Sequence, residues 1–431
     1  MAFHELVQHL HAVPTQGSSH AGDRPEADLK PGVTAPRWLL VLLTAIGPAS
    51  FQIFLPSLPG IRAGFGVAAG TAQLALSLSM LGIAAATLAY GSLSDRFGRR
   101  PVLLGGMGLL VAGSLICATA PSIWTLIAGR IVQAAGGAAG MVVTRAIVVD
   151  VYGREQAGRV LAGLLAAMMI APLLATPLGG VLNDLAGWRV NFLAIAVAAA
   201  VTLVMVWRRL PETRRQRESD GARRAGLLAD YRRLLGSRCF NGFALQGAFA
   251  MAAFTAFNTA APYALSGSLG LTATQVGLTF VAVSVGFAAG SLGASRMPDT
   301  IGLSRRALLG SAAGFAAAGA GLALALAGTW TVWALVAPAA LFALATGVTM
   351  PASQAGAMNA VPELSGTASG LSGFMGTALA AAATQVVGTA SNGTPLPVAW
   401  GLALLAAASL VAALLAFHPG FLEPLGSEPS E

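Results

Sequence analysis

The stretch GSLSDRFGRRP, residues 91–101, places one acid, three arginines and two glycines between two long apolar runs. Elsewhere charges are scarce, because 10% of the 431 residues are charged and 55% are hydrophobic. A water-soluble domain carries about 25% charged residues, since ionised side chains face the solvent. The sequence therefore excludes a soluble globular protein and predicts a chain that crosses a membrane many times.

The apolar runs on either side of this stretch have the length of membrane-spanning helices. A hydrocarbon core of about 30 Å needs roughly 20 apolar residues per helix. We expect an all-α polytopic membrane protein with twelve transmembrane helices in two pseudo-symmetric six-helix bundles. The expected spans are 38–59, 71–90, 101–119, 123–149, 158–181, 188–207, 240–265, 273–294, 307–328, 330–352, 364–390 and 396–417.

The basic residues predict how these spans are oriented. With the amino terminus inside, 21 of the 25 basic residues fall in cytoplasmic segments, and only Arg62 and Arg189 lie outside. The remaining two, Arg130 and Arg145, fall within the fourth span. This asymmetry follows the positive-inside rule, so both termini are predicted to be cytoplasmic.

The polar segments divide the chain into five parts. We expect a disordered tail (1–37), a first bundle (38–207), a cytoplasmic linker (208–239), a second bundle (240–417) and a short tail (418–431). The linker is Arg-rich and should contain a short amphipathic helix around 227–235. Its arginines either bind anionic lipid headgroups or act as a topological determinant, and we favour the second interpretation.

Several other classes of partner are not expected. The net charge of +8 comes from short Arg clusters and not from one basic face, so no nucleic-acid partner is predicted. Two cysteines cannot make a disulfide framework. Four of the five histidines lie in the polar amino-terminal tail, where we expect no metal site.

An internal repeat supports the division into two halves. Asp95 is followed three residues later by Gly98, and Asp299 is followed in the same way by Gly302. Both pairs come after an even-numbered span and precede an Arg pair. Parallel six-helix repeats around a central cavity are a transporter architecture, with the substrate near the middle of the membrane.

The 91–101 stretch resembles the signature loop of the major facilitator superfamily at nearly every defining position. Segments 54–59, 130–133, 171–180, 187–189 and 365–370 resemble its twelve-span drug:proton antiporter branch, in particular the bicyclomycin and chloramphenicol resistance group. The resemblance covers essentially the whole chain from Trp38 to Phe417. It implies a bacterial inner-membrane multidrug efflux protein that confers antibiotic resistance and uses the proton gradient, without a bound cofactor.

The signature stretch is also predicted to form a cytoplasmic latch. A carboxylate can accept from the exposed N–H groups of a helix start, and an Arg can pair with a carboxylate across the cytoplasmic face. Asp150 is the partner that we expect for Arg99 or Arg100. The alternative, that the arginines only set orientation, does not explain the acid and the glycines. The expected latch residues are Gly91, Asp95, Arg96, Gly98, Arg99, Arg100 and Asp150.

The fifth span should be bent and closely packed. Pro172 and Pro177 each remove a backbone hydrogen bond, while Gly179 and Gly180 allow close approach of another helix. This segment resembles the antiporter motif of the superfamily. The second Pro sits one position late, with Thr176 where it is expected, which weakens the inference of antiport.

The fourth span carries the most chemistry. Arg130, Gln133 and Met141 share one helical stripe, and Arg145 lies about 60° from Arg130 around the helix. An Arg in hydrocarbon is costly and marks a functional path by default. Arg145 either serves the cavity or extends to the cytoplasmic interface. The residues expected to line the substrate cavity are Gln52, Arg130, Gln133, Met141, Arg145, Phe254, Asn258 and Gln385.

The interior lacks a group that could carry a proton. The resemblance puts Gln52 where the drug-resistance group usually has a titrating Asp, and Gln cannot ionise. All 17 acids lie in tails, loops or span ends. A cavity with fixed positive charge and no carboxylate should accept a neutral, zwitterionic or anionic substrate and repel a lipophilic cation.

We therefore predict a transporter that exports small amphipathic compounds by alternating access, linked to the proton gradient. The alternative that Gln52 raises is an uncoupled facilitator, or an exporter of a neutral or anionic metabolite. The spans contain no constellation for hydrolysis or metal catalysis, so an enzyme is not expected. The predicted partners are a small-molecule substrate and the lipid bilayer, and the protein is expected to be a monomer.

Overall fold

The computed structural model describes residues 35–214, 227–298 and 300–416, which form helices joined by short turns. The first half contains α2 (Arg37–Gln52), η1 (Leu55–Ser57), α3 (Leu58–Phe65), α4 (Ala69–Phe97), α5 (Arg99–Ala118), α6 (Ile123–Ala186) and α7 (Arg189–Arg209). After α8 (Leu227–Gly236), the second half contains α9 (Arg238–Gly267), α10 (Ala273–Ser295), α11 (Leu303–Leu326), α12 (Val332–Asn359), η3 (Pro362–Leu364), α13 (Ser365–Ala390) and α14 (Pro395–Ala416). The all-helical prediction is confirmed for these residues.

The number of spans agrees with the apolar runs. Among the described residues, 11 helical segments are long and apolar enough to cross a membrane, and Ile170–Ala186 adds a shorter apolar helix. The expected amphipathic helix is also present, as α8. The predicted tails lie outside the described residues, apart from 35–37 at the start of α2.

Helix α6 contains two spans, because the chain reverses direction within it. Gly137 lies against Gly47 of α2, and Gly179 lies against Ile53, which directly follows α2 and is only six residues further along the chain. A straight helix would separate Gly137 and Gly179 by about 63 Å, at 1.5 Å per residue. The fourth and fifth spans are therefore antiparallel neighbours, as Ile123–Tyr152 and Ile170–Ala186 indicate.

The signature stretch is not a loop, which corrects the sequence-based expectation. Helix α4 continues to Phe97, and α5 begins at Arg99, so Gly98 alone breaks the helical conformation. Its φ of 99° lies in the region that favours glycine. A single left-handed residue thus turns the chain between the second and third spans.

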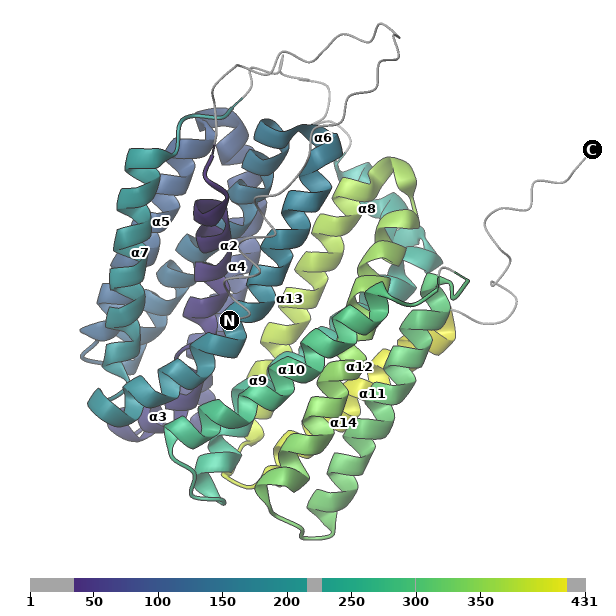
Figure 1. The fold of residues 1–431 in the computed structure, drawn as a ribbon. Coiled ribbons are helices and arrows are strands. Elements are labelled where there is room, and N and C mark those ends of the chain that lie inside the picture. Colours follow the sequence, from purple (N-terminus) through teal and green to yellow (C-terminus); the bar gives the residue numbers. More distant parts are fainter. Residues whose placement is uncertain (1–34, 215–226, 299, 417–431) are drawn as a thin grey trace, which may run out of the picture. The chain divides into compact units, whose positions relative to one another are not determined.

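Most arginines of the described helices lie at one end, which we call the basic end; it includes Gly98, Asp150 and Arg209. The other end, which includes Gly66, Gly187 and Gly270, is called the opposite end. Figure 1 shows α10 beside α6 and α13 beside α4, and these two pairs of helices are in contact. The two halves therefore pack directly on each other through the fifth and second spans.

Candidate functional site

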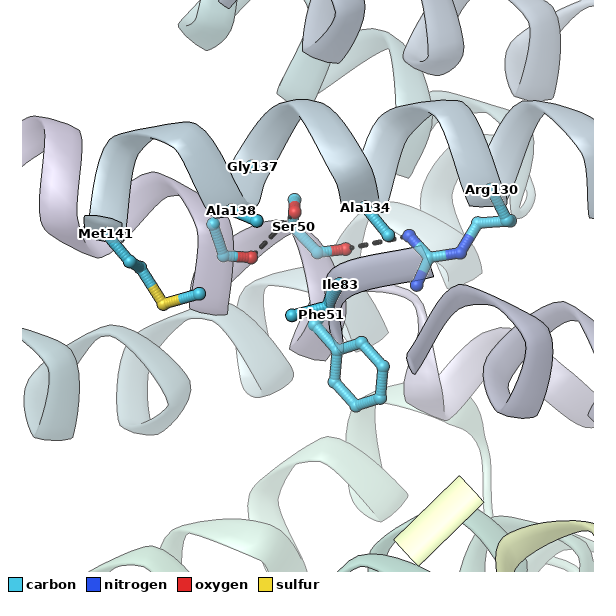
Figure 2. Close-up of a pocket in the computed structure, with 9 residues that line it drawn as sticks. Ser50, Phe51, Ile83, Arg130, Ala134, Gly137, Ala138 and Met141 are labelled. Carbon is cyan, nitrogen blue, oxygen red and sulfur yellow. Dashed lines mark hydrogen bonds between the residues drawn. The ribbon is translucent and has the colours of Figure 1, made fainter. Parts of the chain in front are cut away.

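A pocket lies at the centre of the first half, between α2, α4 and α6 (Figure 2). About 10 Å³ of it is open to the centre of a water-sized molecule. A cavity needs about 10–15 Å³ of such space to hold one water, so the pocket is nearly closed in this conformation and a substrate requires the surrounding helices to move apart. Its lining consists of Gly47, Ser50, Phe51, Ile83, Arg130, Ala134, Gly137, Ala138 and Met141.

Arg130 is the charged group of this pocket and is 1% exposed. Its Nη1 donates to the backbone oxygen of Ser50 over 3.2 Å and also to Oε1 of Gln133. The guanidinium carbon lies 3.9 Å from the ring centroid of Phe54 and 5.8 Å from that of Phe51. Cation–π contacts of this kind stabilise a positive charge away from water.

The hydrogen-bonding capacity of Arg130 is only partly used. Its Nε and Nη2 atoms are buried and have no hydrogen-bond partner within the described residues. A buried unpaired donor is costly, and it is paired in most native structures. Arg130 lines the pocket, but both atoms have almost no accessible surface, so an oxygen of a bound molecule can reach them only when the surrounding helices move apart.

Gln133 accepts a hydrogen bond from Arg130 and does not line the pocket. It is fully buried, and its Nε2 donates over 2.8 Å to Ser114 of α5. Close packing requires Gly113 here, since a Cβ at that position would lie 2.6 Å from the Cα of Gln133. The predicted neighbour of Arg130 is thus a positioning group, one step removed from the pocket.

The other predicted cavity residues are not brought together here. Met141 lines the pocket, while Gln52 is half-buried at the end of α2 and Arg145 is exposed. Phe254 stacks on Phe287, with ring centroids 5.4 Å apart. The last two, Asn258 and Gln385, are placed on α9 and at the contact of α13 with α4.

A second pocket, in the other half, contains no charged side chain in its lining. It lies between α9, α12 and α13, offers about 40 Å³ to the centre of a water-sized molecule, and is lined in part by Met251, Met350, Ser353, Gln354 and Ser372. Ser353 connects it to a buried polar network, because its Oγ donates to Oε1 of Gln246 over 2.7 Å. Sequence reasoning did not single out this network.

Two glycines of the fifth span lie in close backbone contacts. A Cβ at Gly179 would overlap the carbonyl oxygen of Ile53, and one at Gly180 would overlap that of Ala273 in α10. The helix continues through Pro172 and Pro177. Small residues therefore allow backbone-to-backbone contact with both halves of the chain.

Arg99 is the centre of the charge cluster at the basic end. Its Nε lies 2.9 Å from Oδ2 of Asp150, and its Nη1 lies 2.5 Å from Oδ1 of Asp95 and 2.7 Å from Oγ of Ser94. The side chains of Arg99 and Asp150 are only 12% and 15% exposed. The structure thus pairs Asp150 with Arg99, linking α5 to α6.

The start of α5 is capped by a residue that sequence reasoning missed. Glu212, three residues after α7, accepts from the backbone N–H groups of Arg99 and Arg100 over 2.9 and 3.1 Å. The carboxylate at this helix start is therefore that of Glu212, while Asp95 pairs with Arg99. An acid in the Pro-Glu-Thr sequence at 211–213, just after the sixth span, could have indicated this cap. It lies among the ten arginines of the linker region, which directed attention to the basic residues.

The repeated motif of the second half is described only in part. Arg306 donates to the backbone oxygens of Ile301, Met297 and Pro298 over 2.7, 3.2 and 2.9 Å. Asp299 lies outside the described residues. Gly302 precedes α11 with φ −58°, so it does not repeat the left-handed turn of Gly98.

Two sets of membrane-length helices, joined by an Arg-rich linker and packed through their second and fifth spans, define a multi-pass transport protein. The family model described as the Major Facilitator Superfamily matches residues 40–384. The chain belongs to this family, as its motifs predicted.

Several of its relatives carry names of the drug-resistance branch that the motifs indicated. The chain is 32% identical over 338 residues to Multidrug resistance protein D of Escherichia coli (strain K12), covering 78% of this chain and 84% of that protein. It is 34% identical over 247 residues to Chloramphenicol resistance protein of Pseudomonas aeruginosa, covering 57% of each. The fold is similar to that in a crystal structure of a D-xylose-proton symporter, with a TM-score of 0.72 and 13% identity over 89% of this chain and 96% of that one.

Proposed function

We propose that this chain exports small amphipathic compounds, including antibiotics, from the bacterial cytoplasm by alternating access. The observation that carries the proposal is Arg130, a buried cation with two unused donors beside a pocket in the first half. The names of the relatives, one for multidrug and one for chloramphenicol resistance, supply the substrate class. A transporter of this family needs no bound cofactor for such a cycle.

Arg130 also favours a class of substrate charge. The pocket lining contains no carboxylate to compensate the guanidinium, and its other side chains are apolar or hydroxyl-bearing. A lipophilic cation would be repelled there, whereas an oxygen of a neutral, zwitterionic or anionic compound could accept from Nε and Nη2. We propose that substrates come from this second group.

The energy source is the proton gradient in this proposal. An uncoupled facilitator or metabolite exporter is the second candidate, because Gln52 stands at the position of the usual acid. Substrate-induced proton flux in proteoliposomes separates the two. A flux that scales with substrate supports coupling, while transport with no flux across a saturating substrate series supports the second candidate.

The cluster around Arg99 is proposed to act as a latch at the cytoplasmic face of the inner membrane, with both termini inside. The Asp150–Arg99 contact supports this role, because it joins two helices of the first half at the basic end. Reporter fusions at both termini test the orientation. An outside signal from either terminus would overturn it.

Efflux itself is tested in a bacterial strain that lacks its own drug pumps. Expression of the chain should raise resistance to phenicols and lower their accumulation in energised cells. Unchanged accumulation of every neutral, zwitterionic and anionic compound in a panel, with the protein present in the membrane, would contradict the proposal.

A further inference from the structure

The two halves of the chain are hydrogen-bonded to each other at the opposite end. Within the described residues, every side-chain hydrogen bond that joins residues 35–209 to residues 238–416 lies there. Each of these bonds involves either Asp184, at the end of α6, or Gln385, near the end of α13, and one of them is donated by Ser77 of α4. The same seam contains close glycine contacts, since a Cβ at Gly277 of α10 would lie 2.8 Å from the oxygen of Thr176.

Asp184 caps a helix of the other half. Its Oδ1 and Oδ2 accept from the backbone N–H groups of Ala273 and Thr274, over 3.2 and 2.8 Å. These groups belong to the first turn of α10, which contains no acid of its own. A carboxylate at a helix start satisfies orphan N–H groups and interacts favourably with the helix dipole.

Gln385 makes the second connection, from α13 to α4. Its Oε1 accepts from Oγ of Ser77 over 2.8 Å, and its Nε2 donates to the backbone oxygen of Gly70 over 3.0 Å. Both ends of the amide are therefore used in holding the two halves together. Its neighbour Thr389 lies so close to Gly70 that a Cβ there would be 3.3 Å from the Thr389 backbone.

Gln73 lies one turn from Gly70 and Ser77 on α4. Its side chain disfavours the state in which the two halves are in contact. Its side chain is fully buried, and neither Oε1 nor Nε2 has a hydrogen-bond partner within the described residues. It is packed against Gly388 of α13, where a Cβ would lie 2.8 Å from the Gln73 Cβ. Burying an unpaired amide is unfavourable, and separation of α4 from α13 would return it to water.

We propose that the opposite end is a balanced gate, in which Asp184 and Gln385 hold the halves together and the buried amide of Gln73 favours their separation. This inference rests on the proposed alternating-access cycle. It assigns positioning roles to three residues away from the substrate pocket. A gate with opposing contributions of similar size can open without a large input of energy, which a transport cycle requires.

The gate is tested by the distance across the opposite end in the full-length purified protein. Spin labels at Ala63→Cys on α3 and Ser268→Cys after α9 report the distance, in a chain with Cys117→Ala and Cys239→Ser. Both labelled positions are exposed, and they lie on different halves. Asp184→Asn and Gln385→Ala should each raise the ratio of separated to closed populations about threefold or more.

Gln73→Leu should change the same ratio in the other direction. The substitution keeps the volume of the side chain and removes the unpaired amide, so the closed population should rise by a similar factor. An unchanged ratio for Asp184→Asn, or a larger separated population for Gln73→Leu, would overturn the proposal. Thermal unfolding of each variant shows that the chain is folded.

Two matched controls lie away from the gate. Glu363→Gln removes an acid at the basic end, and Gln354→Leu replaces an exposed amide on α12. Neither should alter the distance distribution. The measurement needs no substrate, so it is independent of the proposed substrates. Normal drug efflux with an unchanged ratio in all three gate variants would reject the gate and leave the transport function standing.

Discussion

The two halves of the chain each contain a buried polar network, and the networks differ in charge and in completeness. In the first half, Gln133 connects Arg130 to Ser114, and two guanidinium nitrogens remain unpaired. In the second half, Gln246 donates to the oxygen of Ala307 and to Ser311 Oγ over 2.7 and 2.8 Å. Its own oxygens accept from serines of α12 and α14, over 2.7 and 3.0 Å.

This difference separates a structural network from a functional one. The amide of Gln246 uses both nitrogen and oxygen, so its network joins four helices and leaves no donor for a ligand. Arg130 retains unused donors beside a pocket, an arrangement that costs stability and is retained where it serves function. The first half should therefore recognise substrate, and the second should act mainly as a rigid partner.

Replacing Arg130 by Met should have the largest effect on transport. The variant removes the charge and keeps an unbranched apolar side chain, and we expect at least about a tenfold loss of efflux, as loss of a charged hydrogen-bond donor implies. The midpoint of thermal unfolding should fall only slightly, because the Gln133 oxygen loses its partner while an incompletely paired buried charge is removed. Accumulation assays and thermal unfolding measure the two effects.

Arg145→Met is the matched control, since it makes the same change on the same helix at an exposed position. It should reduce efflux much less than Arg130→Met. Equal losses in the two variants would show that total positive charge matters and that the pocket does not.

Gln246→Leu should break the network of the second half, lowering stability and leaving efflux unchanged. It leaves the Ala307 oxygen and the hydroxyl of Ser353 without their partner, at a cost of about 2–3 kcal/mol of stability. The unfolding midpoint should fall while efflux per folded molecule stays near the original value. Gln354→Leu, at an exposed position, serves as its control. Loss of efflux in fully folded Gln246→Leu protein would place recognition in both halves.

Glu212→Gln tests how much the charged cap at the start of α5 contributes to the stability of the first half. Gln keeps an oxygen but loses the negative charge that caps the start of α5, so we expect a loss of about 1 kcal/mol, since the site is exposed. Thermal unfolding at low and high salt measures the change. A loss that does not shrink at high salt would argue against a role for the charge.

Glu363→Gln should have the smallest effect. Its ion pair with Arg233 spans 3.4 Å, and both side chains are more than 60% exposed. Exposed pairs contribute little, so stability should change by less than about 0.5 kcal/mol. A larger change in the same thermal assay would mean that the charges of the second half matter as much as those of the first.

The features that follow from local composition could be predicted from the sequence. The length of the apolar runs indicates the spans, and the position of Asp150 at a span end indicates it as a partner of Arg99 or Arg100; the structure pairs it with Arg99. Helical periodicity places Gln133 on the pocket stripe, whereas in the structure its side chain is turned toward Ser114. A helical wheel cannot distinguish a pocket from a neighbouring helix when both adjoin the same face.

Contacts between segments far apart in sequence could not be predicted. Asp184 and Gln385 find their partners 89 or more residues away, across the two halves. Glu212 caps a helix more than 110 residues earlier in the chain. Hydrophobic periodicity also did not predict that α4 continues to Phe97. The turn to α5 is made by Gly98 alone, and its positive φ is visible only in the structure.

The dependence of resistance on substrate charge in a pump-deficient strain decides whether Arg130 selects the substrates. Minimum inhibitory concentrations are measured for phenicols and for ethidium-like cations, with the original chain and with Arg130→Met at equal membrane levels. We expect resistance to phenicols, none to the cations, and loss of the phenicol resistance in the variant. Resistance to the cations without resistance to phenicols would contradict this expectation.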